Sequence, residues 1–142
     1  MNAPSKETLR LLLKIAKEVP TLKKTERNEA ARFNYPSIDG YYEKVASLAK
    51  DAGLLWVMRE TEFNLAEMKD ELVSKVTYAF DIYTNDGDFV KDFMTISVML
   101  PYSDAQTSGI AASFSDKIFM RTLFKVGTGE PDADSLAGRK KS

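Results

Sequence analysis

The chain has 142 residues, enough for one domain with a hydrophobic core but short for two. It contains no cysteine and no histidine, which excludes disulfides, thiolate chemistry, histidine-containing triads and most zinc sites. Its net charge of −1 excludes a globally basic nucleic-acid binder, so electrostatic recognition must come from local patches such as residues 1–32, which hold eight Lys or Arg and four Asp or Glu.

The first predicted element is an amphipathic helix over residues 5–19. Ser5 is its expected N-cap and Pro20 ends it, because proline disfavours the helical conformation of the residue before it. Its predicted apolar stripe consists of Leu9, Leu12, Leu13, Ala16 and Val19. We interpret the cations of its outer face as a solubilising surface made by Arg10, Lys14 and Lys17.

Residues 21–32 are polar and of mixed charge, and they are predicted to form a loop or a weak helical extension. This basic segment, which ends at Arg32, either orders on a phosphate backbone or is an exposed linker. Phe33 and Tyr35 follow in a short extended piece. A second helix is expected to begin at residue 38 and to end with Gly53 in the left-handed conformation.

Three strands are predicted next, over residues 54–62, 72–84 and 89–100. Residues 63–71 are interpreted as a polar connection, and the NDGD sequence at residues 85–88 predicts a tight turn. The second strand alternates, with a predicted core face of Leu72, Val76, Tyr78, Phe80 and Ile82. The fold class is therefore α+β, an antiparallel three-stranded β-meander with one apolar face and flanking helices.

A last helix is predicted within residues 104–134. Lys117, Arg121 and Lys125 fall within about 80° of one another on a helical wheel, and Ile110 and Phe114 lie on the same side. A row of three cations is commonly a solvated face, but the aromatic residue beside it favours an anionic partner that can stack. Residues 130–142 lack an apolar pattern and are predicted to be a disordered tail behind a single domain of residues 1–129.

The segment FNYPSIDGYYEKVASLAKDAGL, at residues 33–54, joins an aromatic-x-Tyr piece to a helix that ends in a Gly-Leu step. The segment QTSGIAASFSDKIFMRTLFKVGTGEPDAD, at residues 106–134, runs from Gln-x-x-Gly through a basic helix to an Asp-rich end. In this order, and with strands between them, the two segments resemble the motifs of the Erf (essential recombination function) family of phage single-strand annealing proteins.

The resemblance implies a β-β-β-α core like that of annealing recombinases, assembled as a ring or helical homo-oligomer. Such a protein binds single-stranded DNA in a basic groove and anneals strands for homologous recombination. The resemblance implies a protein that is not an enzyme and needs neither ATP nor another cofactor nor a metal. The absence of a GxxxxGK[ST] phosphate loop from the sequence agrees with annealing without ATP. The implied partners are single-stranded DNA, further copies of the chain, and a phage exonuclease or a single-strand binding protein.

The predicted DNA contacts are Lys117, Arg121, Lys125, Arg59, Lys75, Arg32, Phe33 and Tyr35. The helix cations are expected to touch phosphates on the floor of the groove, and Arg59 and Lys75 belong to the strand face that the core does not use. Phe33 and Tyr35 either stack on bases or sugars or form a hydrophobic plug between helix and sheet.

No apolar run approaches the ~20 residues that span a bilayer, and the N-terminus lacks the apolar core of a secretion signal. A soluble protein of the host cytoplasm with no membrane partner is therefore expected.

Two other functions stay open at this point. A magnesium-dependent nuclease would draw on Asp81, Asp86, Asp88, Asp92 and Lys91. However, Asp86 and Asp88 occupy the predicted turn, where aspartate is expected for backbone reasons. The other alternative is a protein-interaction module that binds no DNA.

Overall fold

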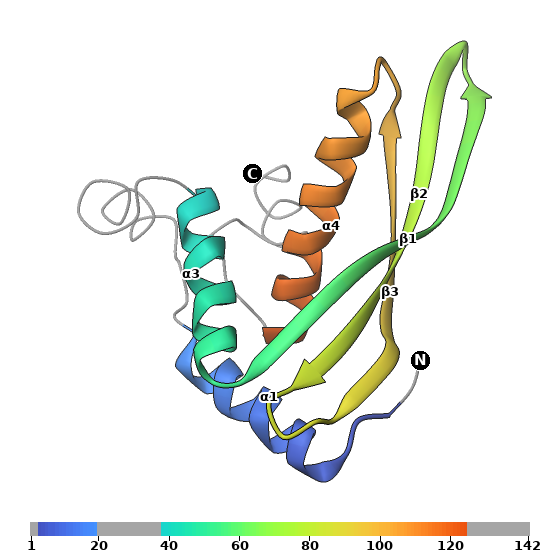
Figure 1. Cartoon of the computed structure of the whole chain (residues 1–142). Helices are drawn as coiled ribbons and strands as arrows, with labels where there is room; N and C mark the ends of the chain where they lie inside the picture. The colour runs from blue at the N-terminus through green and yellow to red at the C-terminus, as the bar shows by residue number, and fades with distance from the viewer. Residues whose placement is uncertain (1–2, 20–37, 125–142) are drawn as a thin grey trace, which may run out of the picture.

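The computed structural model describes residues 3–19 and 38–124 (Figure 1). Its helices and strands, in chain order, are α1 (Lys6–Glu18), α3 (Ile38–Asp51), β1 (Leu54–Met68), β2 (Glu71–Thr84), β3 (Phe89–Pro101) and α4 (Gln106–Phe124). The strands form one antiparallel sheet in the order β1-β2-β3. This α+β meander, with helices before and after the strands, confirms the predicted fold class. The tail predicted over residues 130–142 lies outside the described residues.

The hairpin of β1 and β2 is much longer than the sequence predicts. β1 continues to Met68, and a two-residue turn at Lys69 and Asp70, with φ of 52° and 63°, leads directly into β2. The prediction of a polar connection over residues 63–71 is therefore wrong. Strand pairing is made by backbone groups, so it continues through residues whose side chains carry no strand signal.

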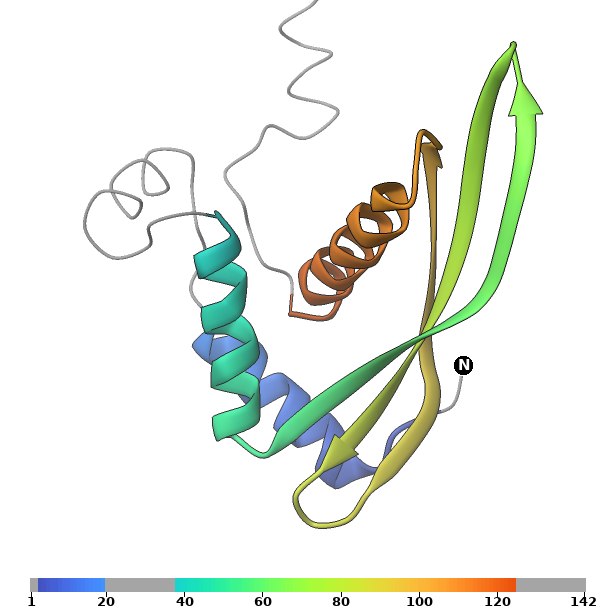
Figure 2. The ribbon, with the colours of Figure 1, turned by 45° about the horizontal axis from the view of Figure 1, so that its top comes forward.

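The outer part of this hairpin, residues 61–72, extends beyond the helices, and we call it the hairpin arm (Figures 1 and 2). A register shift between Glu60 and Glu62 marks its base. Every residue of the arm is exposed. The prediction that Leu72 belongs to the core is wrong for this reason, because no described helix covers the arm and the side chain is 43% exposed.

The core lies between one face of the sheet and the helices α3 and α4 (Figure 2). Phe119 of α4 is fully buried and stacks on Phe80 of β2, with ring centroids 4.3 Å apart. Trp56 of β1 packs against Phe119 at 5.2 Å. Tyr41 and Val45 bring α3 into the same cluster. Apolar side chains at even-numbered positions of β3 also pack here: Val90, Met94, Ile96, Val98 and Leu100.

The helix α1 runs across one end of the molecule, near the turn between β2 and β3 (Figure 1). Ser5 is its N-cap, as predicted, and its hydroxyl accepts a hydrogen bond from the backbone N–H of Thr8 at 3.2 Å. The buried side chains of α1 are Thr8, Leu12 and Ile15. Thr8 faces inward because its Oγ1 donates to Asp88 at 2.6 Å. The predicted apolar stripe is therefore partly wrong, and Leu9 and Leu13 are 51% and 56% exposed.

Gly53 joins α3 to β1 in the left-handed conformation, as predicted, with φ of 99°. Its carbonyl accepts a hydrogen bond from the backbone N–H of Asn85 at 2.9 Å. A Cβ at this position would lie 2.7 Å from the Asn85 side chain. Both the backbone conformation and this contact require glycine, which connects the start of the sheet to the β2–β3 turn.

Candidate nucleic-acid interface

One face of α4 carries two exposed apolar side chains followed by two cations, and we call this set the α4 stripe. Ile110 is 57% and Phe114 48% exposed, Lys117 is half-buried, and Arg121 is exposed. Steps of four, three and four residues place these side chains within about 60° around the helix and about 16 Å along it. The structure thus confirms that the apolar pair shares the side of the cations.

The other side of α4 is anchored to the sheet. Phe119, about 160° around the helix from Lys117, is fully buried and packs against Trp56 with ring centroids 5.2 Å apart. Asp116 accepts a hydrogen bond from the indole Nε1 of Trp56 at 2.8 Å. This bond turns the carboxylate toward β1, about 100° around the helix from Lys117. Asp116 and Lys117 nevertheless line one hollow between α3 and α4, so this carboxylate is bonded to β1 and also lies beside Lys117. The sequence does not reveal the bond because Trp56 is 60 positions away.

An open hollow of about 290 Å³ lies beside the α4 stripe, between α3 and α4. Lys117 lines it from α4, and Tyr42 and Glu43 line it from α3. The stripe is therefore continuous with a shallow recess of mixed polarity rather than standing alone on a convex surface.

A family model described as the ERF superfamily matches residues 10–142, nearly the whole chain. The chain belongs to the ERF superfamily. The matched range includes both segments that resemble Erf motifs, residues 33–54 and 106–134, so the resemblance is confirmed. Membership supports a role in phage-type recombination and strand annealing. Among curated proteins, no relative matches this chain.

In this ERF protein, Arg59 lies on the sheet face away from the helices, within a network of two aspartates. Its Nε and Nη2 donate to Asp81 at 2.7 and 2.9 Å, and Nη2 also donates to Asp92 at 2.6 Å. These hydrogen bonds raise the pKa of Arg59, and the Arg59 guanidinium holds the pKa of Asp81 below its ordinary value. Arg59 was predicted to contact DNA, but its positive charge is largely compensated within the protein.

The same network holds an irregularity in the pairing of β2 with β3. The register shifts between Phe80 and Ile82, and Asp92, opposite this shift, has φ of 53°. Asp81, only 4% exposed, accepts a hydrogen bond from the backbone N–H of Asp92 at 2.8 Å. Asp81 therefore satisfies both the guanidinium and a backbone donor that the bulge releases from regular pairing.

The carboxylates considered for a nuclease have other contacts in this ERF protein. Asp88 accepts hydrogen bonds from the hydroxyls of Thr8 at 2.6 Å and Ser5 at 2.7 Å, and these bonds lower its pKa. Asp86 accepts a hydrogen bond from the hydroxyl of Thr84 within the turn. Within residues 3–19 and 38–124, no group of three or more acidic side chains is arranged to hold a metal ion.

The remaining predicted contacts are only partly within the described residues. Lys75 is exposed and pairs across the hairpin with Asn64, near the base of the arm. Four predicted contacts lie outside the described residues and stay predictions: Lys125, Arg32, Phe33 and Tyr35. No helix in the described part of the chain is both long and apolar enough to cross a membrane.

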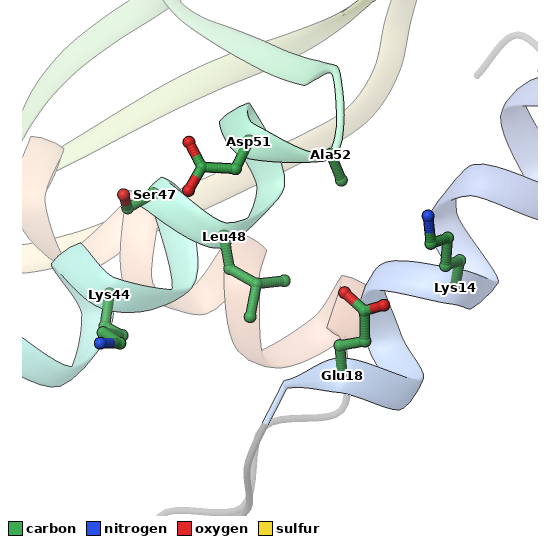
Figure 3. Close-up of a pocket in the computed structure, with 7 residues that line it drawn as sticks. All are labelled: Lys14, Glu18, Lys44, Ser47, Leu48, Asp51 and Ala52. Carbon is green, nitrogen blue, oxygen red and sulfur yellow. The ribbon is translucent and has the colours of Figure 1, made fainter.

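A second cationic surface lies on α1. From the sequence, the cations of this helix were interpreted as a solubilising face. Its exposed cations are Lys6, Arg10, Lys14 and Lys17. None of them forms an ion pair with any residue that the structure describes. Figure 3 shows Lys14 at an open hollow of about 390 Å³ between α1 and α3, which Glu18, Lys44 and Asp51 also line.

Proposed function

We propose that this protein binds single-stranded DNA along the α4 stripe and anneals complementary strands without ATP, as a ring or helical homo-oligomer. Membership in the ERF superfamily supports the annealing role. The observation that carries the site is the exposed ring of Phe114 on the same side of α4 as Lys117 and Arg121. Proteins that bind single strands combine cations along the backbone with aromatic rings on which bases stack.

In this proposal, Lys117 and Arg121 contact phosphates and Phe114 stacks on a base. Lys75 is a further phosphate contact because it is exposed. Arg59 contributes least, since its guanidinium already donates three hydrogen bonds to two carboxylates. The proposal also keeps the predicted contacts outside the described residues, namely Lys125, Arg32, Phe33 and Tyr35.

Assembly is part of the proposal because one protomer offers few cations. Each phosphate neutralised on a single strand contributes only about 0.7 to the salt dependence of binding, so a stable complex needs several protomers on one strand. The strands β1 and β3 are the two edges of the sheet, and an unpaired edge is a docking site for another chain. An exonuclease or a single-strand binding protein is the further partner that we propose.

The test is the titration of a labelled oligonucleotide at several salt concentrations. We expect Lys117→Ala with Arg121→Ala to weaken binding and to reduce the slope of log affinity against log salt by about 1.4. Phe114→Ala should weaken binding about tenfold with little change of that slope, because stacking releases no counterions. The matched control replaces two exposed lysines elsewhere, Lys50→Ala with Lys69→Ala, and should leave both quantities near those of the parent protein.

Binding of the Lys117 and Arg121 double variant with the affinity and slope of the parent would show that the site is misplaced. A parent protein that binds no oligonucleotide at any salt concentration would favour the protein-interaction module. Cleavage of the labelled strand after magnesium is added would favour the nuclease.

A further inference from the structure

The four exposed cations of α1 form one continuous surface, which we call the α1 row: Lys6, Arg10, Lys14 and Lys17. They lie within about 80° around the helix and extend about 16 Å along it. Glu7 and Glu18 are outside this sector, at its edge. Like charges four residues apart destabilise a helix, so the row has a cost for the isolated protein that an anionic partner would offset.

The α1 row differs from the α4 stripe in having no aromatic side chain. Its apolar neighbours are Leu9 and Leu13, both more than half exposed and both aliphatic. Single strands gain much of their affinity from stacking on aromatic rings, which α1 does not offer. A duplex offers no unpaired bases but carries one negative charge per ~1.7 Å of its axis, twice the density of one of its strands. A surface that binds by charge alone therefore favours the duplex.

A membrane surface fits the α1 row less well. A helix that lies in a bilayer interface buries its whole apolar face among the lipids. In α1 the inward face, with Leu12 and Ile15, already belongs to the protein core. Only Leu9 and Leu13 remain for lipid, whereas the cations continue through the length of the helix.

We propose that the α1 row is a second binding surface, separate from the α4 stripe, which takes the phosphate backbone of duplex DNA. The hollow shown in Figure 3 is not part of the row, because Glu18 and Asp51 line it together with Lys14 and Lys44. This inference rests on the proposed function, because annealing produces a duplex beside strands that are still unpaired. The C-terminal end of α4 lies toward α1 (Figure 1), so the helices that carry the two surfaces are neighbours within one protomer.

The experiment measures, with the full chain, the binding of a labelled blunt duplex and of a labelled single strand over a series of salt concentrations. The test variant replaces all four cations: Lys6→Gln, Arg10→Gln, Lys14→Gln and Lys17→Gln. Glutamine keeps the helix propensity of lysine and arginine, and far-ultraviolet circular dichroism checks the fold. We expect the slope for duplex to fall by up to about 3.6 and the duplex affinity at low salt to fall at least ~tenfold. Single-strand affinity should stay within about twofold of the parent, since the phosphate and stacking contacts of α4 are retained.

A matched variant of opposite sign removes the two carboxylates at the edge of the row, Glu7→Gln with Glu18→Gln. It should strengthen duplex binding, because repulsion between these side chains and the phosphates is lost. The double variant of Lys117 and Arg121 should show the reverse selectivity, with single-strand binding weakened and duplex binding retained.

Five results would overturn the inference. The first is duplex binding by the four-fold variant with the slope of the parent; normal single-strand binding would then leave the proposed function intact. The second is an equal loss of duplex and single-strand binding, which would mean one shared site. The third is a parent protein that binds phosphatidylglycerol vesicles through the row but binds no duplex. The fourth is a four-fold variant whose mass in solution falls to that of a monomer, because lost assembly would then explain the weaker binding. The fifth, a parent protein that binds neither form of DNA, would overturn the proposed function as well.

Discussion

The two halves of the β1–β2 hairpin differ in what holds them together. From Leu54 to Glu60, alternate side chains of β1 pack against α3 and α4, with Trp56 in contact with Phe119. From residue 61 onward every side chain of β1 is exposed, although the pairing with β2 continues to Met68. The first half is thus held by burial and the arm mainly by backbone hydrogen bonds. Pairing can therefore extend a strand well past the point where the core ends.

The largest effect should come from the packed half. Phe119→Ala removes a fully buried ring that contacts both Phe80 and Trp56, so we expect it to lower the free energy of unfolding by about 3–5 kcal/mol. Phe63→Ala is the matched change in the arm, where the ring is 40% exposed and meets Tyr102 edge-on at 6.3 Å. It should cost less than about 1 kcal/mol. Urea unfolding followed by circular dichroism measures both.

These measurements should be made at several protein concentrations. If Phe63→Ala costs as much as Phe119→Ala, and the cost grows with concentration, a neighbouring protomer covers the arm in solution. The distinction between a packed and an exposed half would then hold only for the isolated chain.

The next effect should come from the network on the uncovered face of the sheet. Asp81→Asn removes the charge that Arg59 contacts with two hydrogen bonds, and we expect a loss of about 1–3 kcal/mol near neutral pH. Because the pKa of Asp81 is lowered in the folded state, its stabilisation is present above the ordinary aspartate pKa of about 3.9 and is lost as the pH falls through the folded value. The difference between parent and variant should therefore shrink below about pH 4.

The control for this prediction is Glu67→Gln, an exposed carboxylate in the arm. It should change the free energy of unfolding by less than about 0.5 kcal/mol at neutral pH. A difference between the parent and Asp81→Asn that persists unchanged at low pH would contradict the assignment, since it would mean that the ionised carboxylate is not what stabilises the fold.

The fold was predictable from the sequence where the signal is local. The alternate core positions of β2 from Val76 to Ile82, the N-cap at Ser5 and the left-handed Gly53 are properties of neighbouring residues, and the structure confirms them. The hairpin arm was missed because backbone pairing leaves no mark on side-chain pattern. The inward turn of Thr8 was missed because its partner, Asp88, is 80 positions away.

The candidate site follows the same division. The exposure of Ile110 and Phe114 was predictable because four side chains on one helix have a geometry that the sequence alone determines. The pairing of Arg59 with Asp81 and Asp92 was not, because these contacts join residues 22 and 33 positions apart, brought together by strand register and a bulge. Long-range pairs of this kind decide whether the charge of a cation is compensated within the protein.

The smallest effect should come from a buried hydroxyl that lacks a hydrogen-bond partner in the packed half. Ser115 of α4 is fully buried, and its hydroxyl makes no hydrogen bond with the described residues. Ser115→Ala should therefore raise the free energy of unfolding by about 1 kcal/mol, because a buried polar group without a partner is removed. Ser113→Ala, on an exposed position of the same helix, reports the gain from helix propensity alone, which is about 0.5 kcal/mol. Equal effects of the two changes in urea unfolding would show that the Ser115 hydroxyl forms a hydrogen bond in solution. The packed half would then contain no unsatisfied hydroxyl at this position.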